Sequence, residues 1–202
     1  MANYLLHGLK DVAQWYTPGV AQPCKAISAR PQAAYELTNK HNTVAVVSDG
    51  SRMLGLGNIG ALASLPVMEG KAKLFNYLGG VDTVPICLAT QNADEIVSAV
   101  CAIAPAFGGI NLEDIEYPKC VGILEALRTR LTIPVWHDDQ QGLAVVVIAA
   151  LTKALLLLSK QVASARIVLI GRDDIYAGQE DRSEKWRICQ ESNGAQCRGG
   201  IA

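Results

Sequence analysis

Two pairs of adjacent acidic residues are the first places where this sequence could do chemistry. Glu113 and Asp114 follow the stretch GGINL. Asp138 and Asp139 follow IPVWH. Carboxylate oxygens suit Mg²⁺ or Mn²⁺, and neighbouring residues on a strand end point in opposite directions, so we expect one member of each pair to reach a metal ion. The structural alternatives are a helix N-cap at the second pair and a solvated loop at the first.

Lys71 and Tyr16 are further candidates, each with an ordinary structural explanation beside it. Lys71 follows Gly70 in an apolar surrounding, and a lysine held in low dielectric has a pKa below its usual ~10.4, which suits an amine base. Such a lysine can equally bury its stem and extend its ammonium into water. Tyr16 precedes Thr-Pro-Gly, so a rigid turn can present its hydroxyl to a cleft, or its ring can simply pack.

Two glycine-containing stretches resemble dinucleotide-binding loops. Gly55, Gly57 and Gly60 form a literal G-x-G-x-x-G, and Asp82 lies ~20 residues further on, where a ribose contact is expected. The fingerprint requires a strand that leads directly into its first glycine, whereas DGSRML intervenes here. The alternative is a glycine-rich turn that packs against neighbouring backbone. The second stretch starts at Gly171 and is considered below.

The elements that must position these residues follow from the hydrophobic pattern beyond residue 83. We predict strands at 83–90, 108–114, 132–139 and 166–171, and helices at 92–105, 118–131 and 143–158. Asn92 is the expected N-cap of the first helix, with Glu95 as its capping-box partner. The second helix has one apolar face, formed by Cys120, Leu124, Leu127 and Leu131.

Alternating strands and helices with short connections predict an α/β fold, in which a parallel sheet is covered by helices. Ligands bind beyond the carboxyl ends of the strands in such sheets. Both acidic pairs end a predicted strand, so we expect them at the same rim of the sheet.

Composition bounds the class of protein. The formal net charge of −1 gives no electrostatic reason to expect nucleic acid or an anionic membrane as partner. The start of the chain has no pattern of a secretory signal, and the apolar run 143–158 contains Lys153 and is shorter than the ~20 residues that a bilayer requires, so it is interpreted as a core helix. The six cysteines form no C-x-x-C pair, which favours reduced thiols in a cytoplasmic protein.

The last 32 residues differ from the rest of the chain. They contain 11 charged residues, against 26 in the preceding 170, and show no sustained period of two or 3.6. Gly171 follows the apolar run RIVLI, as a dinucleotide loop would, but is succeeded by RDDIY. Bulky side chains and two carboxylates there would oppose the pyrophosphate at a helix N-terminus.

Four stretches occur in a fixed order: YTPGVAQPC, VAVVSDGSRMLGLGNIGALASLPVMEGKAKLF, IAPAFGGINLEDIEYPKC and IPVWHDDQQG. Together they resemble the N-terminal, substrate-side domain of bacterial-type malic enzymes over about residues 12 to 170. The resemblance implies a substrate and metal domain at 1–137 and the beginning of a Rossmann-like NAD(P)-binding domain at 138–170. Residues 171–202 are then an atypical tail, frameshifted or disordered.

The family oxidises (S)-malate with NAD⁺ or NADP⁺ and decarboxylates the product to pyruvate, with Mg²⁺ or Mn²⁺. By resemblance, Lys71 is the base on the malate C2 hydroxyl and Asp138 its hydrogen-bonded partner. Glu113, Asp114 and Asp139 match the metal ligands. An anionic partner raises the pKa of Lys71, so burial, the metal and a nearby arginine must offset it.

The remaining roles implied by the resemblance concern both ends of the substrate. Tyr16 matches the acid that protonates C3 of the enolate, and Arg52 matches the arginine that binds the substrate carboxylate in a bidentate fork. The Gly55–Gly60 stretch belongs to the substrate side, so the cofactor loop is expected at Gly171, in degenerate form.

The expected partners are malate, oxaloacetate or pyruvate, and a second copy of the chain or a full-length relative. No nucleic acid and no membrane are expected. The alternatives to a malic enzyme, complete or truncated, are a non-dehydrogenase module that binds metal and dicarboxylate or dimerises, and a metal-dependent oxaloacetate decarboxylase.

Overall fold

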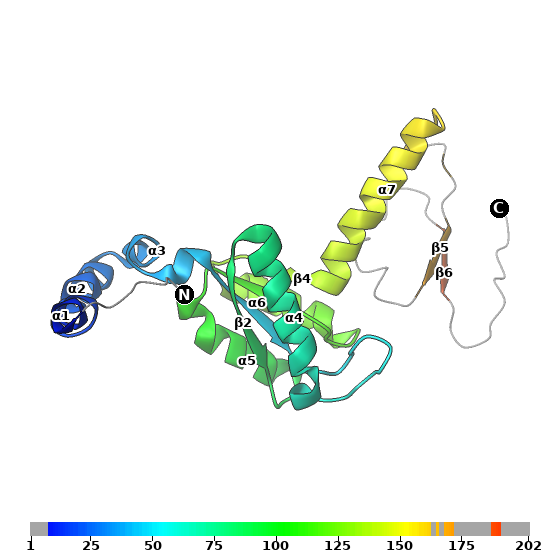
Figure 1. Cartoon of the computed structure of the whole chain (residues 1–202). Coiled ribbons are helices and arrows are strands. Elements are labelled where there is room, and N and C mark those ends of the chain that lie inside the picture. Colours follow the sequence, from blue (N-terminus) through cyan, green and yellow to red (C-terminus); the bar gives the residue numbers. More distant parts are fainter. Residues whose placement is uncertain (1–7, 163–164, 166–167, 172–186, 191–202) are drawn as a thin grey trace.

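A four-stranded parallel sheet forms the centre of the chain (Figure 1). The computed structural model describes residues 8–162, 165, 168–171 and 187–190. The strand order is β2-β1-β3-β4, and the strands are β1 (Thr43–Ser48), β2 (Asp82–Cys87), β3 (Gly109–Leu112) and β4 (Val135–His137). The predicted α/β class is therefore confirmed, with β1 as a central strand that the pattern beyond residue 83 did not include.

Alternation along β1 separates the two faces of the sheet. Val46 packs against Met53 and against Met68 of α4 (Ala61–Gly79), which covers one face. Ala45 and Val47 point to the other face and join the larger core cluster. Successive side chains on a strand point to opposite faces, so one apolar strand serves both layers.

The second face is covered by α5 (Ala93–Ile103) and α6 (Lys119–Arg130), close to the predicted helices. The Asn92 side chain caps α5 by accepting from the backbone N–H groups of Asp94 and Glu95, as predicted. The other half of the capping box differs, because the Glu95 carboxylate accepts from the Thr90 hydroxyl. The predicted apolar face of α6 is buried at Cys120, Leu124 and Leu127, with Leu131 partly buried.

The stretch between β1 and α4 is a glycine-rich turn, in agreement with the structural alternative. Twelve residues separate Ser48 from Ala61, where α4 begins. Gly50 lies in the left-handed region (φ 67°), and a Cβ there would come within 2.3 Å of the Gly60 carbonyl oxygen. This close backbone approach requires glycine.

The apolar run beyond β4 is helical but is not a core helix. A π-helical turn, η4 (Asp138–Gly142), leads into α7 (Leu143–Leu157), which projects away from the sheet (Figure 1). Of its residues only Leu155 is buried, whereas Val146 is 64% and Leu157 77% exposed. The core-helix interpretation is wrong because, among the described residues, no second layer closes over this helix. By length and composition, the continuous run Asp138–Leu157 is also a candidate membrane span.

The predicted strand at 166–171 is present as β5 (Val168–Gly171), but it does not extend the central sheet. It pairs in parallel with β6 (Arg187–Gln190) in a separate two-stranded sheet. Except for Gly171 and β6, the atypical tail lies outside the described residues.

An arm of short helices precedes the sheet. It comprises α1 (Leu9–Trp15), α2 (Ala21–Ala29), η1 (Pro31–Ala33), α3 (Ala34–Leu37) and η2 (Asn39–Asn42). Figure 1 shows the arm extending from the end of the sheet at which β1 begins. Lys40 anchors its base by donating to the Ala104 and Phe107 carbonyl oxygens.

Candidate metal centre

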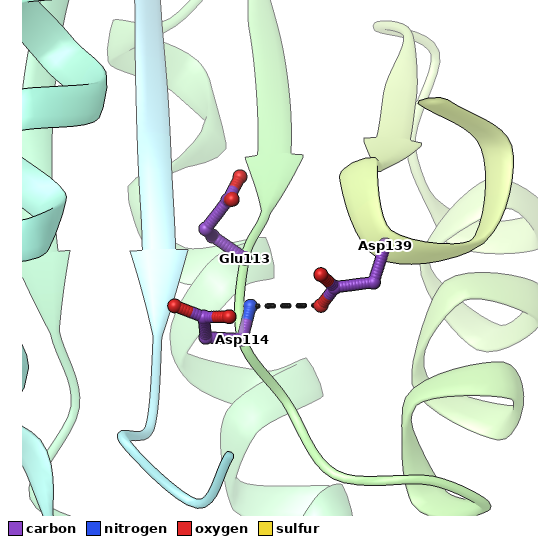
Figure 2. A group of neighbouring side chains, drawn as sticks. All are labelled: Glu113, Asp114 and Asp139. Carbon is purple, nitrogen blue, oxygen red and sulfur yellow. Dashed lines mark hydrogen bonds between the residues drawn. The ribbon is translucent and has the colours of Figure 1, made fainter. Parts of the chain in front are cut away.

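Three carboxylates meet at the carboxyl ends of β3 and β4. Glu113, Asp114 and Asp139 each offer one oxygen, and these oxygens lie within 4.8 Å of one another. Figure 2 shows the three side chains gathered around the end of β3, with Asp139 approaching from η4. Glu113 and Asp114 are buried and Asp139 is half-buried. The structure thus brings the three predicted metal ligands together.

The backbone at Asp114 explains why both members of the first pair reach the cluster. Asp114 has φ 52°, in the left-handed region, so the chain turns there instead of continuing as a strand. The expectation that only one member would face the metal is therefore wrong for this pair. The Asp114 N–H donates to Asp139 Oδ2 at 3.2 Å, and its carbonyl oxygen accepts from the Arg52 N–H at 3.1 Å. Two backbone hydrogen bonds hold this uncommon conformation in place.

The two residues of the second acidic pair make different contacts. Asp139 joins the cluster, whereas Asp138 Oδ2 lies 2.6 Å from Lys71 Nζ. Lys71 Nζ also lies 3.1 Å from Glu113 Oε1 and thereby links the two pairs. His137 holds the N-cap position of η4, and no side-chain cap is made there. The helix N-cap alternative therefore does not describe Asp138 or Asp139.

The contacts of Lys71 decide its protonation. Burial by itself would lower the pKa of this amine, but the hydrogen bond to Asp138 and the charge of Glu113 more than offset it, so the pKa is raised. The expected lowering by burial is therefore wrong for the arrangement that the structure describes. At neutral pH Lys71 is an ammonium, and it becomes a base only when positive charge is added near its two carboxylate partners.

Burial disfavours the charged form of two of the carboxylates. It raises the pKa of Glu113 to about 7, against the opposing effects of Lys71 and Asn111. Burial and then the Asp139 charge raise the pKa of Asp114 to about 6. A divalent cation among these oxygens would compensate both effects, since it adds the positive charge that the cluster lacks. The donor set, all hard oxygens with two residues buried, fits Mg²⁺ or Mn²⁺.

Arg52 lies at the same rim. Its guanidinium Nη1 is 3.9 Å from Asp139 Oδ2, and its side chain is 25% exposed. The guanidinium is thus close to the cluster and still accessible from solvent, as a group that binds a substrate carboxylate requires. It follows the buried turn Asp49–Ser51, which fixes its backbone.

Several supporting residues were not predicted from the sequence. Asn111 Nδ2 donates to Glu113 Oε2 at 2.8 Å from two residues earlier on β3. A period-two reading of the strand could have found it, because residues two apart share a face. Lys119 Nζ lies 2.7 Å from the fully buried Asp49. Nothing in the local pattern links these two residues, which are distant in sequence.

Two predicted site residues do not join the cluster. Tyr16 lies at the end of α1 in the arm and is 70% exposed. Gly171 is the last residue of β5, and the loop after it lies outside the described residues. The predicted cofactor loop therefore stays a prediction.

The comparisons with known proteins agree on one family. Residues 3–95 match the family model described as malic enzyme, N-terminal domain. The chain is 56% identical over 161 residues to an NAD-dependent malic enzyme of Geobacillus stearothermophilus, covering 80% of this chain and 34% of that protein. It is 48% identical over 162 residues to an NADP-dependent malic enzyme of Salmonella typhimurium, covering 80% and 21%.

Solved structures agree with the sequence comparisons. The crystal structure of malic enzyme from Pyrococcus horikoshii matches with a TM-score of 0.83 and 55% identity, over 85% of this chain and 40% of that one. An NAD-dependent malic enzyme from Thermotoga maritima matches with a TM-score of 0.81 and 48% identity, over 83% and 45%.

The chain thus spans well under half the length of the relatives that it matches. An alignment of 161 residues within a chain of 202 necessarily includes the sheet residues from β1 onward and α7. Over this shared stretch, the chain is similar in sequence and in fold to malic enzymes.

Proposed function

We propose that this chain provides the metal- and malate-binding half of a malic enzyme, for oxidative decarboxylation of (S)-malate to pyruvate and CO₂ with NAD⁺ or NADP⁺. The observation that carries the proposal is the convergence of Glu113, Asp114 and Asp139 beside the Lys71–Asp138 pair. The names of the relatives, NAD- and NADP-dependent malic enzymes, support the same reaction.

The three carboxylates would hold Mg²⁺ or Mn²⁺. When bound, such an ion polarises the C2 oxygen of malate and offsets the negative charge that develops when CO₂ leaves. Lys71 then accepts the proton of the C2 hydroxyl, and Asp138 orients the amine through the 2.6 Å contact. Arg52, partly open to solvent at the rim, binds a substrate carboxylate.

The divalent ion also bears on the charge of Lys71. Glu113 is both a partner of Lys71 at 3.1 Å and a proposed metal ligand. If the Glu113 carboxylate is bound to a cation, its negative charge stabilises the Lys71 ammonium less. Metal binding is therefore expected to lower the pKa of Lys71 toward neutrality. One carboxylate shared by the two sites thus links metal binding to activation of the base.

A second candidate function is metal-dependent decarboxylation of oxaloacetate without hydride transfer. The observation that favours it is that the carboxylates and Lys71 are assembled within the described residues, whereas β5, after which the cofactor loop is predicted, pairs outside the central sheet. Oxaloacetate already carries the C2 ketone, so its loss of CO₂ requires the metal and a proton donor but no nicotinamide.

We further propose a cytoplasmic protein that acts with a second copy or a full-length relative. Lys153 lies inside the apolar run of α7, and a lysine deep in a bilayer costs ~2.5–3.5 kcal/mol, which favours a helix packed on protein. The NAD⁺ or NADP⁺ requirement would involve Gly171, at the end of β5.

Two assays on the purified chain test these functions. With the chain, Mn²⁺ and oxaloacetate, we expect pyruvate to form faster than with Mn²⁺ and oxaloacetate in the absence of protein. Lys71→Ala should abolish this difference. Lys73→Ala, which changes an exposed lysine of the same helix, is the matched control. With Mn²⁺, malate and NAD⁺ or NADP⁺, reduced cofactor identifies the complete malic enzyme reaction. Pyruvate formation without any reduced cofactor identifies the second candidate, and loss of neither substrate rejects both.

A further inference from the structure

Asn111 is a polar residue buried in the layer between the sheet and α4. It lies on β3, where Val46 of β1 is its partner in the parallel register. Partners side by side in neighbouring strands point to the same face, and Val46 packs against Met68 of α4. Asn111 therefore shares this apolar layer, and it is only 2% exposed. An amide in such a place requires hydrogen-bond partners.

The amide makes one hydrogen bond and leaves its other end unpaired. Asn111 Nδ2 donates to Glu113 Oε2 at 2.8 Å, whereas Asn111 Oδ1 has no hydrogen-bond partner among the described residues. A buried acceptor without a partner costs free energy that an apolar side chain would avoid. Turning the amide over would not remove this cost, because Oδ1 would then face an oxygen of the ionised Glu113. The hydrogen bond to Glu113 is thus what the buried amide provides.

Both oxygens of the Glu113 carboxylate have a donor. Oε2 accepts from Asn111, and Oε1 lies 3.1 Å from Lys71 Nζ. The two donors belong to different elements, β3 and α4, so a rotation of the carboxylate weakens at least one contact. An ion bound by both oxygens of one carboxylate uses a lone pair of each and competes with both donors. This orientation therefore favours an ion bound by a single oxygen.

Asp139 has a similar arrangement. Its Oδ2 accepts from the Asp114 N–H at 3.2 Å and lies 3.9 Å from Arg52 Nη1. Two of the three carboxylates in the cluster thus have an oxygen that already contacts a donor of the protein. Ca²⁺ takes about six to eight oxygens and accepts carboxylates that bind through both of theirs, whereas Mg²⁺ requires near-octahedral geometry and keeps several waters. A cluster with few unoccupied carboxylate oxygens suits the smaller ion.

We propose that Asn111 is a positioning residue that determines which ion the metal centre prefers. It holds Oε2 of Glu113, leaves Oε1 as the single ligand atom, and so favours Mg²⁺ or Mn²⁺ over Ca²⁺. The inference rests on the proposed function, in which Glu113 is a metal ligand. Without the amide, Oε2 is free to turn toward the ion, and the carboxylate can bind through both oxygens. The larger Ca²⁺ then gains affinity relative to Mn²⁺.

Competition between two ions tests this preference without requiring activity. Free Mn²⁺ is followed by electron paramagnetic resonance while Ca²⁺ is titrated into the Mn²⁺-loaded chain, which gives the ratio of the two dissociation constants. We expect the wild type to prefer Mn²⁺. Asn111→Leu keeps the branched shape but has no N–H donor, and it should lower the preference about tenfold, as should Asn111→Ala.

Val46→Ala is the matched control. It changes the register neighbour of Asn111 in the same buried layer and leaves the amide donor in place, so the wild-type preference should be retained. A purely structural role of Asn111 predicts that both of its variants weaken Mn²⁺ and Ca²⁺ binding by the same factor, and this result would overturn the proposal. An equal loss of preference in Val46→Ala would also overturn it. A wild-type chain that binds no Mn²⁺ rejects the proposed metal centre itself, and the inference with it.

Infrared spectroscopy of the wild-type chain tests the same claim if the variants do not fold. The glutamate side-chain carboxyls are labelled with ¹³C, and spectra with and without Mn²⁺ are subtracted, so that only glutamates affected by the ion contribute. Glu113 is the only glutamate of the three carboxylates. The asymmetric and symmetric carboxylate stretches are further apart when one oxygen binds an ion than when both do. We expect the wider separation, and the narrow separation of a bidentate carboxylate would overturn the proposal.

Discussion

At the scale of single residues, the metal centre depends on carboxylates whose charged forms are disfavoured by burial. Burial raises the pKa values of Glu113 and Asp114, and only Lys71 and Arg52 provide positive charge near them among the described residues. Clusters of this kind are typical of sites whose charge is completed by a ligand. The cluster therefore stabilises a bound cation more than it stabilises the fold.

The stability of the metal-free protein should fall as the pH rises through the raised pKa of Glu113. Its pKa moves from 4.5 to about 7 on folding, so in that interval the folded chain keeps a proton that the unfolded chain has released. The resulting stabilisation is present at acidic pH and is lost as the pH rises through about 7. Urea unfolding in EDTA at pH 5 and pH 8 checks this, and Glu113→Gln should flatten the difference. Equal pH dependence in both proteins would contradict it.

Gly142 is expected to be required for the position of Asp138. A Cβ at Gly142 would lie 2.7 Å from Asp138 Oδ1, so Gly142→Ala should displace the carboxylate that holds Lys71. We expect oxaloacetate decarboxylation to drop at least ~10-fold, because small misplacements of catalytic groups have effects of this size. The matched control is Gly122→Ala, where a Cβ meets nothing within 4 Å. Equal activity in the two variants would reject this role for Gly142.

The pairing of residues was less predictable than their identity. Sequence spacing placed Glu113 and Asp114 at a strand end, and the resemblance supplied their roles. Aspartate adopts the left-handed region more readily than most residue types, but its type alone does not predict that Asp114 adopts this backbone, which turns both carboxylates to one place. It is set by hydrogen bonds from Arg52 and to Asp139, two residues that are far away in sequence.

At the scale of elements, the rim is assembled by loops that are pinned to one another. Ser51 Oγ accepts from the Glu116 N–H and donates to Asp49, and Lys119 pairs with the same buried aspartate. This network ties the turn after β1 to the start of α6. The segment that contains Glu113 and Asp114 is thus held by β3 before it and by this network at Glu116 after it.

Removing Lys119 should destabilise the protein strongly, because it leaves the buried Asp49 carboxylate without its counter-charge. We expect Lys119→Met to lower the free energy of unfolding by about 3 kcal/mol, near the low end for a broken buried pair, since Lys119 keeps 18% exposure. Lys119→Arg preserves the charge and should lose far less. Chemical denaturation measures both, and a Met variant as stable as the Arg variant would show that the pair contributes little.

Periodicity was sufficient where one face of an element is buried in the sheet. The helices α5 and α6 end close to their predicted bounds because their apolar faces and the Asn92 cap are local features. The same pattern gave a wrong prediction of a core helix at α7. An apolar run shows which residues a helix could bury, but it does not show whether another element covers them. The arm was missed because its α-helices have only seven, nine and four residues, and α2 and α3 bury none of theirs.

At the scale of the whole molecule, large apolar side chains are exposed on several parts of the described chain: the arm, the turn that follows β1, α4 and α7. For α7, the relatives extend well beyond the part that they share with this chain. The arm and α7 are different elements, so their effects on association can be separated by substitution.

Charges on the exposed side of α7 should remove a dye-binding surface without affecting the metal centre. Val146 and Leu157 are 64% and 77% exposed, so Val146→Lys combined with Leu157→Lys should at least halve the fluorescence of a bound naphthalene sulfonate dye, with stability changed by less than ~0.5 kcal/mol. Thr152→Lys, on the same helix at an exposed polar position, is the control. Unchanged dye fluorescence in the double variant would mean that this side of α7 is covered in solution.

The central claim is that Glu113, Asp114 and Asp139 bind one divalent ion. Electron paramagnetic resonance of free Mn²⁺, titrated with the protein at pH 8, tests it most directly. We predict one Mn²⁺ bound per chain, at least tenfold weaker binding in Asp139→Asn, and no change in Asp94→Asn, whose carboxylate is exposed at the start of α5. A wild-type chain that binds no Mn²⁺, or an Asp139→Asn variant that binds it equally well, would contradict the account.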